Sequence, residues 1–130
     1  MELKHFAIVF LFLLVLAGCS QQNSDLEKSI YSIVEYPSNS QVDIGSLTDF
    51  EWDKAFLFPP YTSPEEMEEQ LGRDFKDPSN IQSRDDIYLL VFVKDDKVVK
   101  YAEIDRQQAD FSIGNKEYLT PDDSVFEIER

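Results

Sequence analysis

The chain contains a single cysteine and a single histidine, and it lacks the residue patterns that mark several common classes of enzyme. One cysteine cannot form a disulfide within the chain. The sequence has no Gly-x-Ser-x-Gly or His-Glu-x-x-His motif and no glycine-rich motif for phosphates or dinucleotides. Its paired acids lack the spacing and the glycine of an EF-hand. We therefore expect no cofactor and no metal.

A short apolar segment stands near the start of the chain. Lys4 precedes an apolar run of 12 residues, 6–17, which ends in small residues just before Cys19. This run is too short to span a bilayer, which takes about 20 residues. A positive flank, a short apolar run and a small-residue cleavage site are typical of a signal peptide. The sequence Leu16-Ala17-Gly18-Cys19 resembles the lipobox of bacterial lipoprotein precursors.

The resemblance implies a processed and anchored protein. Residues 1–18 would be a lipoprotein signal peptide that is removed, and Cys19 would carry the lipid as the first residue of the mature chain. Residues 19–23 would form a lipidated tether. The protein would then be held by its acyl chains on the extracytoplasmic face of the cell membrane. Because Ser20 replaces the aspartate that favours inner-membrane retention in Gram-negative relatives, the outer membrane is open as a location in such cells.

Processing would also remove His5. Without histidine, and with Cys19 blocked by lipid, Ser-His-Asp and Cys-His catalysis and zinc sites built on His or Cys are excluded. These exclusions leave open catalysis by a pair of carboxylates, as in glycosidases. We therefore predict a protein that is not an enzyme, with a carboxylate-dependent cell-wall hydrolase as the alternative.

The chain is strongly acidic, with a formal net charge of -14 and a sequence pI of about 4.2. Such a charge repels the phosphates of nucleic acids and of anionic lipids, and it attracts basic proteins. Solubility alone is the other interpretation of the same charge. We expect no nucleic-acid partner.

Two helices are predicted in a single domain over residues 24–130. Ser24 and Glu27 have the spacing of a capping box, and the apolar residues that follow share one helical face, which predicts a helix over 25–36. Ser63 and Pro64 predict the start of a second helix, and Gly72 predicts its end. We interpret the acids of this helix as a solvated face rather than a cation site; they are Glu65, Glu66, Glu68 and Glu69.

The remaining segments are predicted to form strands. Alternation predicts a strand over 49–58 in which Phe50, Trp52, Phe56 and Phe58 share one side. The segment 87–93 is apolar on both faces and should be central, paired with 98–104 in a hairpin. A second hairpin is expected over 109–119, and 42–44 and 125–129 should add further strands. The predicted fold class is α+β, with two helices packed on one face of an antiparallel sheet of about four to six strands.

These features predict a membrane-anchored, extracytoplasmic binding lipoprotein that engages a protein at the cell envelope. An immunity or exclusion protein and an accessory subunit of an envelope machine are two versions of this function. Aromatic side chains dominate many protein interfaces. Tyr61, which follows Pro59-Pro60, is the first candidate for partner binding, and Trp52 is the second.

Overall fold

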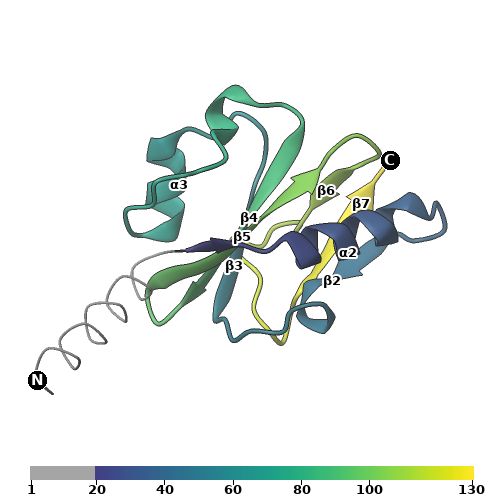
Figure 1. Ribbon diagram of the computed structural model, residues 1–130, viewed down its shortest axis with the longest axis horizontal. Helices are drawn as coiled ribbons and strands as arrows, with labels where there is room; N and C mark the ends of the chain where they lie inside the picture. Colours follow the sequence, from purple (N-terminus) through teal and green to yellow (C-terminus); the bar gives the residue numbers. More distant parts are fainter. Residues whose placement is uncertain (1–19) are drawn as a thin grey trace, which may run out of the picture.

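The computed structural model describes residues 20–130, so the predicted signal peptide and Cys19 lie outside the described residues. Two α-helices, α2 (Ser24–Glu35) and α3 (Pro64–Leu71), lie on either side of a central group of strands (Figure 1). Short 3-10 turns occur at Ile44–Ser46 and Ile81–Ser83. Within residues 20–130, no helix is long and apolar enough to cross a membrane.

The strands form two sheets. The larger sheet has the order β1-β5-β4-β3, with antiparallel pairing except for β1, which runs parallel to β5. The smaller sheet has the order β2-β7-β6 and is antiparallel. The strands of the larger sheet are β1 (Gln21–Gln22), β3 (Lys54–Phe58), β4 (Ile87–Lys94) and β5 (Lys97–Asp105). Those of the smaller sheet are β2 (Gln41–Asp43), β6 (Asp110–Ser112) and β7 (Val125–Glu129).

Strand β4 is buried on both faces, as its continuous apolar sequence predicts. Successive side chains of a strand point to opposite faces. Leu89, Val91 and Val93 therefore pack with α3, in a cluster that we call the α3 core. The alternate residues Leu90 and Phe92 pack with α2, in the α2 core.

The smaller sheet completes the α2 core. Val42, Phe111 and Phe126 contribute buried side chains to this core together with the apolar face of α2. The ring of Phe111 makes edge-to-face contacts with Phe126 at 5.3 Å and with Tyr88 of β4 at 5.4 Å between ring centroids. These aromatic contacts join the smaller sheet to the larger one.

The α+β class and the antiparallel pairing are confirmed. Two details of the arrangement differ from the prediction. The strands divide into two sheets, and the helices lie on opposite faces of the larger sheet rather than on one. The physical reason is the two-sided burial of β4, because each of its apolar faces needs its own cover.

The first helix forms where the sequence predicts it, but its N-cap is one residue earlier. Asn23 is the cap, and its Oδ1 accepts a hydrogen bond from the backbone N–H of Leu26 at 3.1 Å. Glu27, which was expected to reach back to the cap, accepts instead from the backbone N–H of Glu103 at 2.8 Å. The predicted capping box of Ser24 is therefore wrong, because the Glu27 carboxylate accepts a backbone hydrogen bond from β5 instead of one from the helix cap.

The predicted tether belongs in part to the fold. Gln21 and Gln22 pair with Lys100 and Tyr101 as strand β1, and the N–H of Asn23 donates to the carbonyl of Tyr101 at 2.9 Å. The domain consequently begins before residue 24. Residues 21–23 of the tether predicted over 19–23 therefore complete the edge of the sheet instead.

The ends of α3 are confirmed. Ser63 Oγ accepts a hydrogen bond from the N–H of Glu66 at 3.2 Å, and Pro64 occupies the first turn. Gly72 ends the helix with a left-handed φ of 72°, which a residue without a side chain adopts at little cost.

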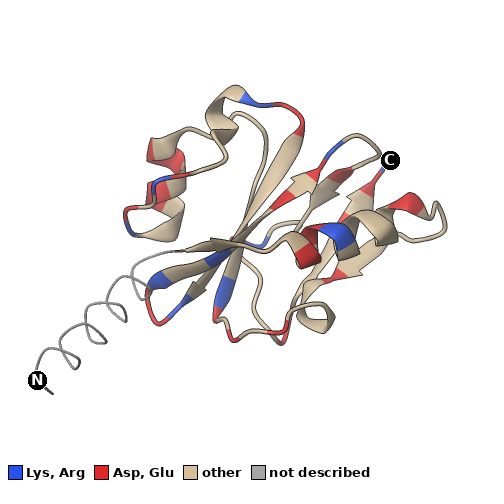
Figure 2. Ribbon diagram, viewed as in Figure 1, with Lys and Arg blue, Asp and Glu red and all other residues tan. Residues whose placement is uncertain are grey.

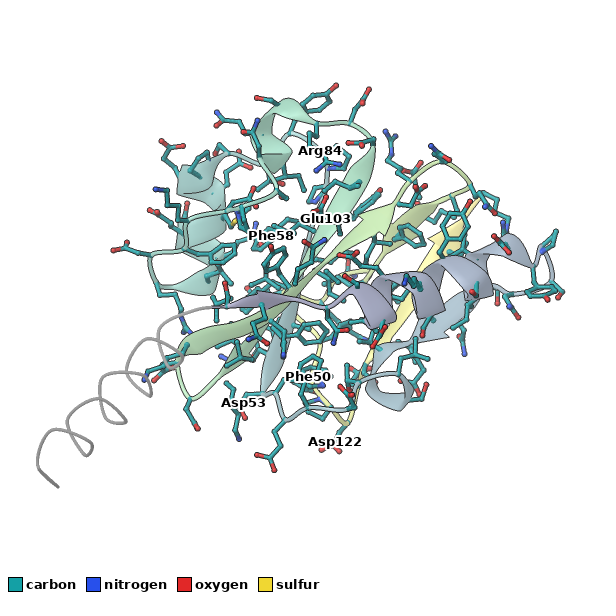
Figure 3. The ribbon with its side chains drawn as sticks, in the orientation of Figure 1. Phe50, Asp53, Phe58, Arg84, Glu103 and Asp122 are labelled. Carbon is teal, nitrogen blue, oxygen red and sulfur yellow. The ribbon has the colours of Figure 1, made fainter. Side chains whose placement is uncertain are left out.

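The aromatic residues of 49–58 do not share one face. Strand β3 begins only at Lys54, and the loop before it places Phe50 and Trp52 against the α2 core. Phe56 and Phe58 pack in the α3 core instead. Figure 3 shows the Phe50 and Phe58 side chains on opposite sides of the sheet. The predicted common face is wrong, because a loop does not keep the alternation of a strand.

The β4–β5 hairpin is confirmed, with an unusual turn. Asp95 and Asp96 have positive φ of 49° and 63°, as a two-residue type I′ turn requires. The carboxylate of Asp53 supports this turn by accepting from the N–H of Asp95 at 2.9 Å.

The second predicted hairpin is wrong. Strand β6 pairs with β7 rather than with 116–119. Leu119, which is fully buried, instead exchanges backbone hydrogen bonds of 2.8 and 2.9 Å with Ala55 of β3. The segment before it therefore crosses towards the larger sheet.

The position of the first helix cap gives a stability prediction. We expect Asn23→Ala to lower the free energy of unfolding by about 1 kcal/mol, because it removes the acceptor for the N–H of Leu26. Ser24→Ala, one residue later, should change it by less than about 0.5 kcal/mol. Urea unfolding of the two variants measures both values. A larger loss for Ser24→Ala would restore the capping box that the sequence suggested.

Candidate functional site

The loop between β3 and α3 presents an exposed aromatic side chain. Tyr61 is 62% exposed, and its backbone has a φ of 66°. Positive φ is rare for bulky residues and costs of order 1–3 kcal/mol. The N–H of Tyr61 donates to the carbonyl of Ile81 at 3.0 Å, and Thr62 Oγ1 donates to the carbonyl of Pro59 at 2.6 Å. These bonds hold the tyrosine outward in a strained conformation.

A second loop, residues 74–82, faces Tyr61 across that hydrogen bond. Asp77 organises this loop, because its carboxylate accepts from the N–H and hydroxyl of Ser79 and from the N–H of Ile81 at 2.6–2.9 Å. Asn80 is also left-handed, with a φ of 56°. Two strained non-glycine residues thus lie on facing loops. Such strain concentrates at functional sites.

Arg84 fixes the same loop from the other side. Its guanidinium forms two parallel hydrogen bonds of 2.9 Å with the Asp86 carboxylate and contacts Glu103 of β5 at 2.7 Å (Figure 3). The same group donates to the carbonyl of Ser79 at 3.2 Å. The hydrogen bond with Asp86 is the main reason that the pKa of Arg84 is raised. Hydrogen bonds and ion pairs of Arg84, and not only apolar packing, therefore hold this loop in place.

A cleft of about 470 Å³ lies between α3 and this loop. Met67 and Phe75 form its apolar part, and Thr62, next to Tyr61, lies on its edge. Its charged lining is three acids and one base; they are Glu68, Asp74, Asp77 and Lys76. We call this feature, with Tyr61, the Tyr61 cleft. Its chemistry favours a partner with an apolar group and positive charge.

A second groove, of about 610 Å³, runs along the other side of α3. Phe56, Leu57 and Ile113 provide its apolar part, and Glu66, Glu69 and Glu117 are among the charged residues that line it. Neither hollow has an exposed aromatic side chain among its lining residues, but Thr62 of the first one directly follows the exposed Tyr61. We therefore place the candidate site at the Tyr61 cleft.

Trp52, the second candidate for partner binding, does not lie on the surface. Its side chain is 5% exposed, its ring contacts Phe92 edge-to-face at 5.3 Å, and its Nε1 donates to Thr48 Oγ1 at 3.1 Å. The prediction for Trp52 is wrong, because the indole fills the α2 core. Trp52 therefore does not join Tyr61 in one surface, since Trp52 is buried and Tyr61 is exposed. Lipidation of Cys19 concerns a residue outside the described part of the chain.

Two exposed aromatic residues were missed by the sequence analysis. Tyr36, at the end of α2, is 65% exposed, and Tyr31 is 37% exposed. Both lie off the helical stripe formed by Leu26, Ile30 and Val34, so the spacing could have identified them. Neither has a left-handed backbone. Tyr36 serves below as the matched control.

Within residues 20–130, three carboxyl groups have a clearly shifted pKa, and each shift is downward. The pKa of Asp53 is lowered by the hydrogen bond from the N–H of Asp95. Hydrogen bonds from Arg84 and Arg106 lower the pKa of Asp86 and Asp110 respectively. A general acid needs the opposite shift, because it must hold its proton near neutral pH. These three residues are suited to ion pairing rather than to acid catalysis.

Residues 20–130 contain no cluster of three or more His, Cys, Asp or Glu side chains that could hold a metal ion. Comparisons with known protein families, with curated proteins and with solved structures give no match to this chain. The interpretation of the site therefore rests on its own geometry.

The pKa of Asp110 gives a prediction about acid stability. Because folding lowers this pKa, ionised Asp110 stabilises the fold above about pH 4, and the contribution is lost as the pH falls through the lower, folded-state value. Asp110→Asn should therefore be less stable than wild type at about pH 7, and the difference should shrink at about pH 3.

Urea unfolding at the two pH values measures this difference. Asp122→Asn is the control, because Asp122 is an exposed acid in the turn 121–124. An unchanged difference for Asp110→Asn at both pH values would show that ionisation of this carboxyl group does not contribute.

The backbone of Tyr61 gives a prediction about strain. Tyr61→Gly should raise the free energy of unfolding by about 1 kcal/mol, because glycine adopts positive φ without a steric penalty. Tyr36→Gly is the matched control. Tyr36 is similarly exposed but has a φ of -87°, so the same substitution should not stabilise. Thermal or urea unfolding compares the two, and a destabilised Tyr61→Gly protein would mean that the tyrosine side chain packs favourably.

Proposed function

We propose that this protein is a lipid-anchored binding module of the bacterial cell envelope that engages a basic protein partner through the Tyr61 cleft. The observation that carries the proposal is the exposed Tyr61 side chain on a left-handed backbone. A strained, solvent-exposed aromatic residue is not explained by packing. A contact with a partner would explain it.

The chemistry of the cleft supports a basic partner. Carboxylates of Glu68, Asp74 and Asp77 surround the apolar surface of Met67 and Phe75, with Lys76 as the opposing charge. A net negative, partly apolar cleft is complementary to a segment that carries Lys or Arg beside an apolar side chain. The overall net charge of -14 would steer such a partner towards the protein.

Binding, rather than catalysis, is the proposed activity. The lowered pKa of Asp53, Asp86 and Asp110 suits these three groups to ion pairs rather than to general acid catalysis. The envelope location comes from the lipobox-like sequence Leu16-Ala17-Gly18-Cys19. Lipidation at Cys19 would place the cleft on the extracytoplasmic side, where an immunity protein or an accessory subunit would act.

Partner capture from envelope extracts tests the proposal. Wild-type lipidated protein should retain a partner at low salt and lose it at high salt, because exposed charges are screened. Tyr61→Ala should weaken capture by about thirtyfold or more, as expected for an aromatic residue at the centre of an interface.

Tyr36→Ala is the matched control, since it removes an equally exposed tyrosine from another surface. Equal capture by the Tyr61→Ala and wild-type proteins would contradict the assignment of the cleft. Digestion of isolated cell-wall material by the purified protein would replace the binding proposal with the hydrolase alternative.

A further inference from the structure

The beginning of the described chain is fixed to the sheet. Gln21 pairs with Lys100 of β5, and Lys100 Nζ donates to Gln21 Oε1 at 2.9 Å. The Gln22 side chain donates to Glu27 of α2 at 2.8 Å. Backbone and side-chain bonds together hold β1 in place, so the chain has little freedom to move relative to the domain from Gln21 onward.

This attachment limits the distance between the domain and a lipid on Cys19. Only Ser20 lies between Cys19 and Gln21, and the two steps along the chain from Cys19 to Gln21 span at most about 7 Å. A flexible tether long enough to lift the domain away from a bilayer is therefore not present between these positions. One end of the molecule, the end at which β1 begins, would have to face the membrane.

The surface at that end differs in charge from the rest of the protein. Ser20 borders a depression whose lining includes Arg73, Lys76 and Lys97. We call these three basic residues the anchor surface. The acids in the lining of the depression are Asp74 and Asp96. In Figure 2, basic segments gather near the start of the described chain, whereas acidic segments are spread over the molecule.

This local excess of positive charge contrasts with the formal net charge of -14 for the chain. The acidic average predicts repulsion from anionic lipids, but charges act over about 8–10 Å at physiological salt. At that range the local charge of the anchor surface, and not the net charge of the whole chain, determines which side of the domain a bilayer attracts.

Arg73 adds a second observation at the same place. Its Nε and Nη1 are buried and have no hydrogen-bond partner within the described residues. Its Nη2 lies 3.5 Å from Asp96 Oδ1, a long contact to an exposed acid. Buried nitrogens without a partner cost free energy. A lipid phosphate can reach only the part of the Arg73 side chain that is exposed, which is 24% of it.

We infer that the anchor surface lies directly on the bilayer and that its basic side chains contact the phosphates of anionic lipids. The inference rests on the proposed lipidation of Cys19, which brings β1 to the membrane. Lipid phosphates then supply acceptors to the anchor surface, and the acidic remainder of the domain points away from the headgroups. The domain is held in one orientation by two attachments, the acyl chains and the basic residues.

Lysine footprinting of the native lipidated protein tests this orientation. The protein is reconstituted into vesicles of phosphatidylcholine, alone or mixed with phosphatidylglycerol, and treated with a water-soluble acylating reagent. Mass spectrometry then gives the labelling rate of each lysine. Lys76 and Lys97 are exposed members of the anchor surface, and Lys28 is an exposed lysine on α2 that serves as the internal reference.

We divide the labelling rates of Lys76 and of Lys97 by that of Lys28. We expect both ratios to be several-fold lower on mixed vesicles than in detergent. The charge-reversal variant Lys97→Glu should reduce the protection of Lys76 on mixed vesicles by about fivefold, the usual contribution of one basic residue near an anionic surface. Lys28→Glu makes the same change in net charge away from the anchor surface and should leave that protection unchanged.

Intact-mass measurement of the same sample separates the two proposals. A lipidated protein whose lysines are all labelled at equal rates on mixed vesicles would overturn the orientation and leave the lipid anchor standing. Equal protection on neutral and mixed vesicles would overturn the contact with anionic lipids. A protein without lipid on Cys19 would overturn the proposed anchor, and the orientation with it.

Discussion

The two-sided burial of β4 is the constraint on which the fold depends. A strand with apolar residues at every position from Ile87 to Val93 needs cover on both faces. Helix α3 covers one face, while α2 and the smaller sheet together cover the other. Neither helix could form this contact without the antiparallel neighbours β3 and β5, which hold β4 in register between them.

The local features of the fold could be predicted from the sequence. Ser63, Pro64 and Gly72 define α3 because caps and helix ends depend on a few neighbouring residues. The β4–β5 hairpin follows from two adjoining apolar segments and a two-residue connection. The error at the first helix has a non-local cause, since Glu27 bonds to β5 rather than to its own cap.

The remaining errors arise where long-range pairing overrides a local pattern. The segment 116–119 resembles the second arm of a hairpin, but Leu119 is buried beside Ala55 of β3, far away in the sequence. The alternation of 49–58 fails because the strand begins late, so Trp52 and Phe56 enter different cores.

At the candidate site, too, the local feature was predictable and the long-range one was not. Pro59-Pro60 identified Tyr61 as a loop residue, but its left-handed backbone and its position across from Asn80 depend on the folded loops.

The two proposed surfaces adjoin each other, which restricts the partner further. Asp74, Phe75 and Lys76 line both the Tyr61 cleft and the depression at the anchor surface. If the anchor surface rests on the bilayer, the cleft opens beside the headgroups rather than on the side that faces away from them. A partner bound there would lie close to the membrane, as a membrane protein or a membrane-bound segment does. The shared residues couple the two contacts, because a lipid phosphate beside the Lys76 ammonium group offsets the positive charge that Lys76 brings to the cleft. Lipid contact at Lys76 would leave the acids of the cleft less compensated, and the attraction of the cleft for a basic partner would then be stronger at the membrane than in solution.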